Sequence, residues 1–218
     1  MSFQHSVALV VVVVTVSAVP VAAEEWHARL AVNRTDTSLS LRDTTEEGNA
    51  LRFEGGNSLG LSLGLERRPS DLIGVEFAID RARPEHEIGV APIGAEEIST
   101  TARMDLWTVR AGLNFHLVPG RPVDLYLGPT VAWLYTPGSF NFRAEVGGHT
   151  SAVTITADNS FGWGGTAGAD VDLGGGWTLS VSYTYLRDEM EFTDGSEGGE
   201  RTLDLDPSML RLGVGIRF

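Results

Sequence analysis

The chain has 218 residues, no cysteine and a formal net charge of −13, and all 16 of its basic side chains are arginine. The lack of cysteine excludes disulfides and thiolate chemistry. The acidic balance argues against nucleic-acid binding, because neutralised phosphates supply most of that affinity. A mean hydropathy of +0.00, with no long apolar run after the first segment, argues against helical membrane spans.

The first segment resembles a secretory signal. Residues 7–18 form the apolar run "VALVVVVVTVSA", and Pro20 and "VAA" follow before the acidic pair at 24–25. An apolar core of about 7–15 residues with small residues at −3 and −1, here Val21 and Ala23, is typical of cleaved signals. A membrane anchor is the alternative, but it needs about 20 apolar residues. We predict a signal peptide at 1–23 and one domain at 24–218.

Eight segments of the mature chain alternate with a period of two, which indicates extended strands with dissimilar faces. One face carries bulky apolar side chains, and the other carries mostly Gly, Ser, Thr and Ala. The segments are "WHARLAV" (26–32), "NSLGLSLGLERR" (57–68), "IGVEFAID" (73–80), "WTVRAGLNFHL" (107–117), "VDLYLGPTVAWLY" (123–135), "FGWGGTAGADVDL" (161–173), "WTLSVSYTYL" (177–186) and "MLRLGVGIRF" (209–218).

The connections between these segments alternate in length. Short Pro- or Gly-rich turns follow the second, fourth and sixth segments, at 67–71, 118–122 and 174–176. Long polar loops are expected at 33–56, 81–101, 137–159 and 187–202. This pattern predicts an all-β fold, an eight-stranded antiparallel up-and-down transmembrane β-barrel of the outer membrane, with both termini in the periplasm.

A soluble lipocalin-like barrel or a β-sandwich also alternates, but it buries its apolar face. Here the small residues suit the crowded interior of a narrow barrel. Aromatic side chains gather near segment ends, as in the interfacial girdles of membrane barrels. They are Trp26, Trp107, Trp133, Tyr135, Trp163, Trp177 and Tyr185.

The last segment places Leu210, Leu212, Val214, Ile216 and Phe218 on one face. A barrel leaves no open edge in lipid, since each unpaired backbone group costs several kcal/mol. We therefore expect this strand to pair with the first strand along its whole length. The alternation that closes on Phe218 also looks like the C-terminal signal that the outer-membrane assembly machinery reads.

Four stretches resemble the outer membrane protein W family. They are "LDLDPSMLRLGVGIRF" with its D-x-D-P-like element at 204–207, "SDLIGVEFAI" with D-x-I-G-V-E at 71–76, "LYLGPTVAWLY", and "FGWGGTAGADVDLGGGWTLSVSYTYL". The resemblance covers nearly all of the mature chain in order, apart from the loops. It implies a narrow, partly apolar lumen that admits small hydrophobic solutes and releases them sideways into the bilayer. Family members can carry an inward aromatic in the penultimate strand, where alternation places Thr184 here.

Alternation turns several polar side chains inward. The candidates for lining the lumen are Arg29, Glu76, Asp80, Arg110, Asn114, Asp124, Tyr126, Asp170, Thr184 and Arg211; Asp172 and Arg217 share the same face. Paired arginines and carboxylates would form either an ionic plug that closes the barrel or a constriction that selects solutes. Under either hypothesis, Arg110→Ala leaves a buried carboxylate uncompensated and destabilises the barrel.

Two further readings remain open. His149 and Ser151 have the His-x-Ser spacing of lipid A deacylases, but they lie in a Gly-rich loop, and His116 is expected to be a structural hydrogen-bonding group. The acidic loops lack an EF-hand spacing, so we expect solvated loops, or divalent ions bridging them to lipopolysaccharide phosphates.

We expect no catalytic residue, metal or cofactor. The expected partners are the bilayer, lipopolysaccharide, the assembly machinery and a small hydrophobic solute; the alternative function is a structural or adhesion barrel whose external loops bind a partner.

Overall fold

The computed structural model describes residues 25–38, 40–44, 50–91, 98–137, 139–146, 149–157, 159–194 and 200–218. The predicted signal peptide lies outside these ranges and stays a prediction. Within them, no helix has the length and apolar character needed to cross a membrane. Eight strands form one closed barrel in the order β1-β16-β13-β12-β9-β8-β5-β4. They are β1 (Glu25–Thr37), β4 (Asn57–Ser70), β5 (Ile73–Ala82), β8 (Leu106–His116), β9 (Val123–Tyr135), β12 (Ser160–Gly174), β13 (Trp177–Arg187) and β16 (Pro207–Arg217).

The barrel closes between its first and last strands, as the sequence predicts. β1 pairs with β16 in an antiparallel register that runs from His27↔Arg217 to Thr37↔Pro207. Beyond the register, the backbone N–H groups of Trp26 and Phe218 each donate to the other residue's carbonyl at 2.9 Å. The final residue is therefore part of the ladder, and no strand edge is left open along the barrel wall.

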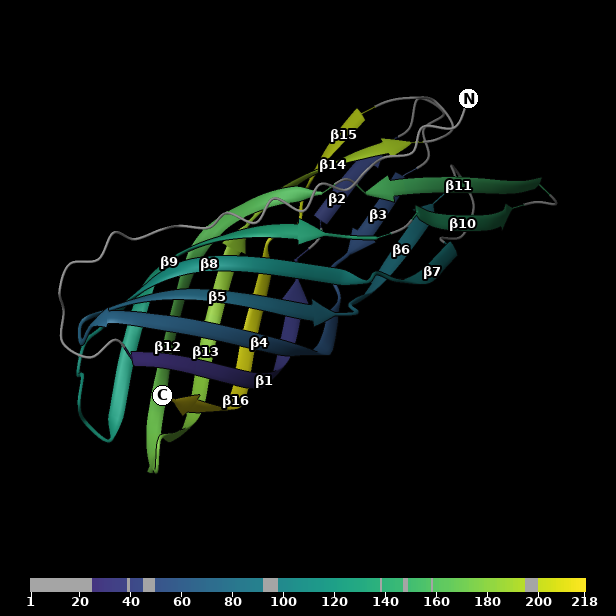
Figure 1. Cartoon of the computed structure of the whole chain (residues 1–218). Coiled ribbons are helices and arrows are strands. Elements are labelled where there is room, and N and C mark those ends of the chain that lie inside the picture. The colour runs from purple at the N-terminus through teal and green to yellow at the C-terminus, as the bar shows by residue number, and fades with distance from the viewer. Residues whose placement is uncertain are drawn as a thin grey trace, which may run out of the picture.

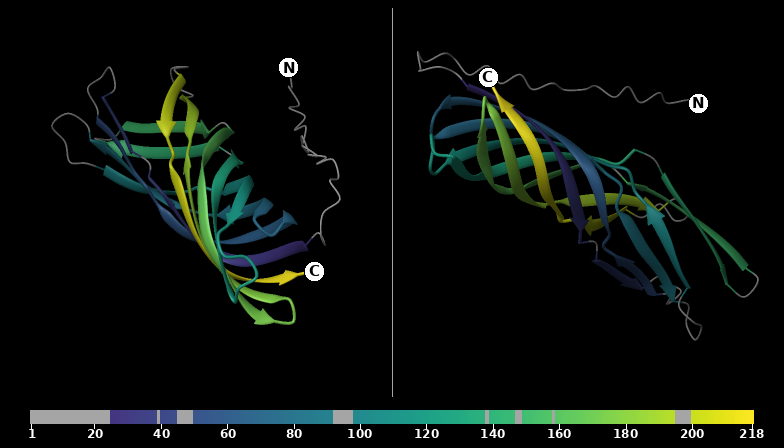
Figure 2. Two further views of the ribbon diagram at one scale, coloured as in Figure 1. Left: turned by 90° about the vertical axis from the view of Figure 1, so that its left-hand side faces the viewer. Right: turned by 90° about the horizontal axis from the view of Figure 1, so that it is seen from below.

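The four long connections are not loops, and this expectation was wrong. They form hairpins that continue beyond the barrel (Figures 1 and 2). The strands are β2 (Ser40–Thr44), β3 (Ala50–Glu54), β6 (Glu85–Ala91), β7 (Ile98–Arg103), β10 (Ser139–Val146), β11 (His149–Ala157), β14 (Glu189–Asp194) and β15 (Glu200–Asp204). They pair into two four-stranded sheets, β2-β3-β6-β7 and β10-β11-β14-β15. We call this side of the barrel the hairpin end, and the side with the three short turns and both strand termini the turn end.

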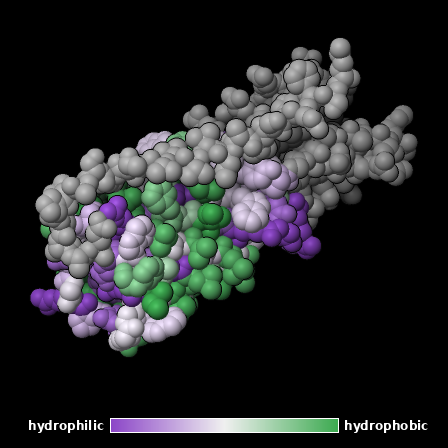
Figure 3. Space-filling model, in the orientation of Figure 1, coloured by the Kyte–Doolittle hydropathy of each residue, from purple (hydrophilic) through white to green (hydrophobic). Residues whose placement is uncertain are grey.

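The wall has an apolar outer face and a polar inner face. In β4, Leu59, Leu61 and Leu63 are between 60% and 75% exposed, whereas the intervening Ser62 is buried. The same alternation runs around the barrel, and hydrophobic residues gather on the part of the barrel that Figure 3 shows. Bulky side chains that look outward have no core to fill, so their burial must come from lipid.

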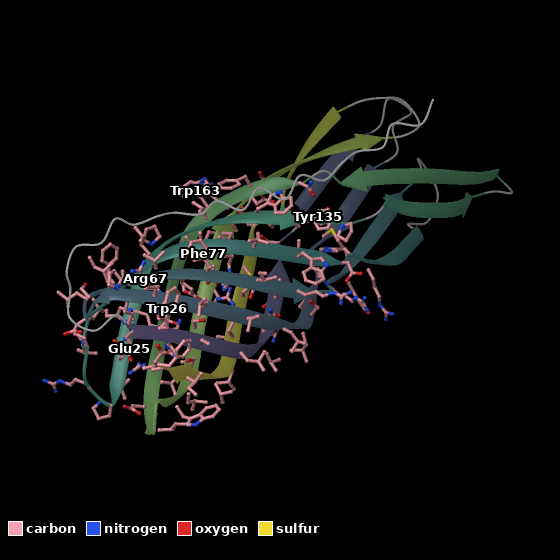
Figure 4. All side chains as sticks on the ribbon, viewed as in Figure 1. Glu25, Trp26, Arg67, Phe77, Tyr135 and Trp163 are labelled. Atoms are coloured by element: carbon pink, nitrogen blue, oxygen red, sulfur yellow. The ribbon has the colours of Figure 1, made fainter. Side chains whose placement is uncertain are left out.

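Aromatic side chains mark both ends of this band. At the turn end, Trp26 is the second residue of β1, Trp177 is the first residue of β13, and Phe218 lies beside Trp26. At the hairpin end are Trp107, Trp133, Tyr135, Trp163 and Tyr185. Figure 4 shows Trp26 near one end of the barrel, with Tyr135 and Trp163 toward the other. Aromatic residues at both ends of an apolar band are typical of the two interfaces of a bilayer.

One charged residue on the inward side of the predicted pattern is exposed. Asp172 is exposed at the β12–β13 turn, where the register shifts between Asp172 and Gly174. Its carboxylate accepts a hydrogen bond from the Gly174 backbone N–H at 2.7 Å. Gly174, Gly175 and Gly176 all have positive φ, which suits glycine in a tight turn. Asp172 pairs with Thr178, which is buried on the inner face, so it keeps the predicted side of the strand and is exposed because it lies at the turn end of the barrel.

Candidate functional site

All ten predicted lining residues lie on the inner face, and each is 9% exposed or less. The interior is therefore packed with side chains at the levels that these residues occupy. The packing falls into three zones along the axis, which we call the turn-side network, the central network and the hairpin-side layer. Each zone is defined by its residues below.

The turn-side network joins two arginines to three carboxylates. Arg29 Nη2 donates to Glu66 Oε2 at 2.6 Å and to Asp170 Oδ2 at 2.7 Å. Arg68 Nη1 donates to Asp124 Oδ2 at 2.8 Å. The sequence analysis missed Glu66 and Arg68. Glu66 continues the inward alternation of β4, and Arg68 lies one step further, in a stretch assigned to a turn.

His116 and Asn114 tie this network together from β8. The Nδ1 of His116 lies 3.0 Å from Asp124 Oδ2, and its Nε2 lies 2.9 Å from Glu66 Oε1. Both nitrogens can donate only when the imidazole is protonated. Asn114 Nδ2 donates to Glu66 at 3.1 Å and to Glu76 at 3.2 Å. The expectation of a hydrogen-bonding His116 fits this geometry.

Tyr126 fills the space beside these charges. The Arg29 guanidinium carbon lies 5.3 Å from the centroid of the Tyr126 ring, a cation–π arrangement. On the neighbouring strand, a Cβ at Gly168 would overlap the same ring. Glycine at position 168 therefore gives the ring its place inside the barrel.

The central network is a chain of hydrogen bonds across the lumen. Asp80 accepts from Arg110 Nε at 2.6 Å and from Arg211 Nε at 3.0 Å. Arg211 Nη1 also donates to Thr184 Oγ1 at 2.9 Å. From Thr184 the chain continues to Thr166 at 2.6 Å and to Thr130 at 2.9 Å. Thr184, at the position where the resemblance allows an aromatic, is thus part of a polar zone.

Charge is balanced across the two networks. Four buried arginines, Arg29, Arg68, Arg110 and Arg211, share the interior with Glu66, Glu76, Asp80, Asp124 and Asp170. A protonated His116 makes the positive side equal to the negative one. Buried charges are tolerated when they are paired in this way. This arrangement supports the ionic plug rather than an open constriction.

A group of possible metal ligands lies within the turn-side network. Ligand atoms of His27, Glu66 and Asp170 lie within 4.8 Å of one another. Arg29 already donates to both carboxylates at short distance. The guanidinium supplies the positive charge that a metal ion would bring, so we assign no metal to this group.

The hairpin-side layer contains five buried apolar side chains, which sequence reasoning missed. Buried polar residues lie beside them: Thr35 pairs with Met209, and Ser160 pairs with Leu134. Leu106, Leu134, Leu186, Leu205 and Met209 are all 1% exposed or less. Four of them face inward at the hairpin end of β8, β9, β13 and β16, and Leu205 lies between β15 and β16. Three of them continue the inward alternation by one step beyond the polar positions, so the signal was present at the segment ends.

One seam of the wall is interrupted. The β8–β9 register has the pair Gly112↔Thr130, omits Leu113 and Asn114, and resumes at Phe115↔Leu127. Pro129 lies opposite this gap and has no N–H to donate. On its other side, β9 stays paired with β12 through Gly165↔Pro129 and Thr166↔Gly128. The weakened ladder is thus confined to the β8–β9 seam, next to the central network.

The possible His-x-Ser pair lies in β11 of a hairpin sheet. Its side chains are outside the described residues, so the structure gives no geometry for a nucleophile and base.

A closed eight-stranded sheet with an apolar outer band, two aromatic girdles and a plugged polar interior defines an integral membrane β-barrel. The sequence matches the outer membrane protein beta-barrel domain family over residues 6–218, and the chain belongs to that family. The barrel recognised in the sequence, and its place in the outer membrane, are confirmed by this match. A comparison with curated proteins finds no match.

Solved outer-membrane proteins have a similar fold. OprG from Pseudomonas aeruginosa is 16% identical with a TM-score of 0.60, over 91% of this chain and 97% of that one. AlkL, solved in DMPC lipid bilayers, is 16% identical with a TM-score of 0.59, over 100% and 97%. Neisserial surface protein A is 14% identical with a TM-score of 0.57, over 88% and 97%. These identities support the fold alone.

Proposed function

We propose that the protein conducts small hydrophobic solutes from the external medium into the outer membrane. The observation that carries this proposal is the order of the interior zones: a layer with five buried apolar side chains at the hairpin end, then two charged networks. A small apolar solute can enter the first zone, but it would have to break paired buried charges to pass the others. In this arrangement the hairpins face outward and both termini face the periplasm.

The interrupted β8–β9 seam offers the sideways exit. Separation of two strands costs less where the ladder already lacks a donor, and Pro129 removes one next to the central network. A solute that reaches this level would leave between β8 and β9 into the bilayer rather than through the plug. The turn-side network then stays intact while a solute passes.

A disulfide across the seam tests this route. Ala111 and Val131 are paired across β8 and β9 on the outer face. Directly opposed residues have Cα atoms about 4.5–5.5 Å apart, which a disulfide can bridge. The chain has no cysteine, so Ala111→Cys with Val131→Cys creates a single possible bridge. The matched control is Val181→Cys with Leu212→Cys, across the paired β13–β16 seam.

The readout is uptake of an apolar fluorescent solute and of a polar solute of equal size by cells that carry each variant. We expect oxidation to slow apolar uptake severalfold in the β8–β9 variant only, and reduction to restore it. Equal uptake by the oxidised and reduced forms would reject the sideways exit. Preference for the polar solute would reject the conduit itself.

The alternative is an adhesion or structural barrel without transport. The two hairpin sheets favour it, because they carry ordered β-structure well beyond the barrel (Figure 1). In that case the hairpins bind a partner and the plugged barrel is a scaffold. Loss of attachment with unchanged solute uptake after a hairpin is shortened would support this alternative. We assign no catalytic role to the chain.

A further inference from the structure

The lipid-facing sides of β1 and β5, the two strands that flank β4, change from apolar to cationic at one level. Along β5 the outward residues Phe77 and Ile79 are followed by Arg81 and then Arg83. Along β1 the outward Leu30 and Val32 are followed by Arg34. All three arginines lie at the hairpin end, at the level where the hydrophobic band stops.

The register places two of these arginines on either side of one leucine. Arg34 of β1 pairs with Leu59 of β4. Leu61 pairs with Arg81, so the same register places Leu59 opposite Arg83. Neighbouring strands are about 4.8 Å apart, and the two flanking backbones are therefore about 10 Å apart. Leu59 between them is 75% exposed.

The guanidinium groups are held in place but keep free donors. Arg34 Nη2 lies 3.1 Å from Asp36 Oδ1, and Arg83 Nε lies 2.6 Å from Asp105 Oδ1. The hydrogen bond from Arg83 holds the pKa of the Asp105 carboxyl below its usual range. Each guanidinium has five N–H donors, so several remain for a phosphate. The three arginines exceed Asp36 and Asp105 by one charge.

Aromatic and aliphatic side chains border the same patch. The guanidinium carbon of Arg81 lies 4.9 Å from the centroid of the Trp107 ring. Trp107 pairs in turn with Tyr135 on β9, within the hairpin-end girdle. The patch thus combines cations at the interface with an apolar wall directly below them.

We propose that Arg34, Arg81 and Arg83 bind the phosphates of an acylated, phosphorylated saccharide lipid of lipid A type in the outer leaflet. The guanidinium forks contact the phosphates, and the acyl chains lie along Leu59, Leu61 and the apolar stripe of β5. Arginine suits this role because its planar fork matches phosphate oxygens. A lipid with two phosphates on a rigid disaccharide can reach cations about 10 Å apart, which favours it over a glycerophospholipid with one phosphate. The proposal rests on the hairpin end facing outward, but not on transport.

The test uses the full mature protein in detergent and native mass spectrometry with added lipid. The probes are diphosphoryl lipid A, its phosphate-free form and phosphatidylglycerol. We expect diphosphoryl lipid A to bind at least tenfold more tightly than either other lipid. The double variant Arg34→Gln with Arg83→Gln should lose at least tenfold in affinity. The control Arg121→Gln, at an exposed arginine of the turn end, should keep wild-type affinity.

Heat-modified migration on gels confirms that each variant is folded before it is compared. Replacement of the same two arginines by lysine keeps the charge and should restore part of the affinity. Equal binding of diphosphoryl lipid A by the wild type and the glutamine variant would overturn the proposal. Equal binding of phosphatidylglycerol and lipid A would also overturn it, since the surface would then recognise any anionic lipid. Both outcomes leave the uptake assay unaffected, so a failure here is distinct from a failure of the conduit.

Discussion

Arg29 is the cation that two fully buried carboxylates share. Glu66 and Asp170 are both 0% exposed, and each accepts from the same Nη2 atom. Other partners contact these carboxylates, but none is as short as the Arg29 contacts except Ser180 to Asp170, at 2.6 Å. Arg68 lies 3.5 Å from both carboxylates, so loss of Arg29 removes the nearest cation and leaves the negative charge of the turn-side network only partly balanced.

We predict that Arg29→Ala lowers the free energy of unfolding by about 3–5 kcal/mol, the cost of breaking a buried ion pair. Urea titration of the protein in lipid vesicles measures this change. Arg34→Ala is the control, because it removes an exposed ion pair with Asp36 and should cost at most about 1 kcal/mol. Equal effects of the two substitutions would show that the network contributes little.

Asp80 gives a second prediction, which refines the one made from the sequence for Arg110. The carboxylate of Asp80 is bound by Arg110 and Arg211 together. Each single alanine substitution leaves one cation in place, and only the double variant strands the carboxylate. We expect the double variant Arg110→Ala with Arg211→Ala to cost more than the sum of the singles, a coupling measured by a double-mutant cycle. Additive costs would show that the two arginines act independently.

At the residue scale, the sequence predicted which side chains face the barrel interior, but not which side chains they bond to. Period-two alternation was enough to place Asp80, Arg110 and Thr184 inside. It could not show that Arg211 bonds Asp80 from 131 positions away, because that contact depends on how the strands are staggered around the barrel. Glu66 and Arg68 were missed because they lie beside a turn, where alternation is harder to read.

At the scale of a single strand, the cost of a charge on the outer face depends on its depth in the membrane. The outward leucines of β4 run from Leu59 at the hairpin end to Leu65 near the turn end. We predict that Leu63→Arg costs about 2–4 kcal/mol, the penalty for arginine near the bilayer midplane. Leu59→Arg should cost only about 0–1 kcal/mol, because it lies at the interface.

Unfolding in lipid vesicles measures both β4 variants. Equal penalties at positions 59 and 63 would contradict the assigned membrane level. Similar unfolding of both variants in detergent, with a difference only in bilayers, would support it.

At the element scale the barrel strands were predictable and the hairpins were not. All eight barrel strands follow from bulky apolar residues at every second position, a pattern imposed by lipid on one side and a narrow lumen on the other. The hairpin strands are shorter and carry more polar residues, so alternation such as that of Phe140 and Phe142 in β10 was not recognised as a strand. β11, "HTSAVTITA", is nevertheless rich in β-branched residues, which favour strands.

At the scale of the whole molecule, strand pairing divides the structure into the barrel and the hairpin sheets. β10 pairs with β11, and β11 pairs with β14, but neither pairs with a barrel strand in the described register. We predict that a short turn in place of residues 139–157 leaves the barrel folded. Heat-modified migration and unchanged unfolding in vesicles would check this. Failure to assemble would show that the hairpin sheet is needed for the barrel to form.

The central claim is that one face of each barrel strand contacts lipid and the other is sealed from water. Single cysteines along β13, each carrying a spin label, measure this directly, because the native chain has no cysteine. We predict that labels at 179, 181 and 183 are reached by oxygen dissolved in the bilayer, and that labels at 180 and 184 are reached by neither oxygen nor a water-soluble nickel complex. Access of the nickel complex to positions 180 and 184 would reveal a water-filled channel and contradict the plugged interior.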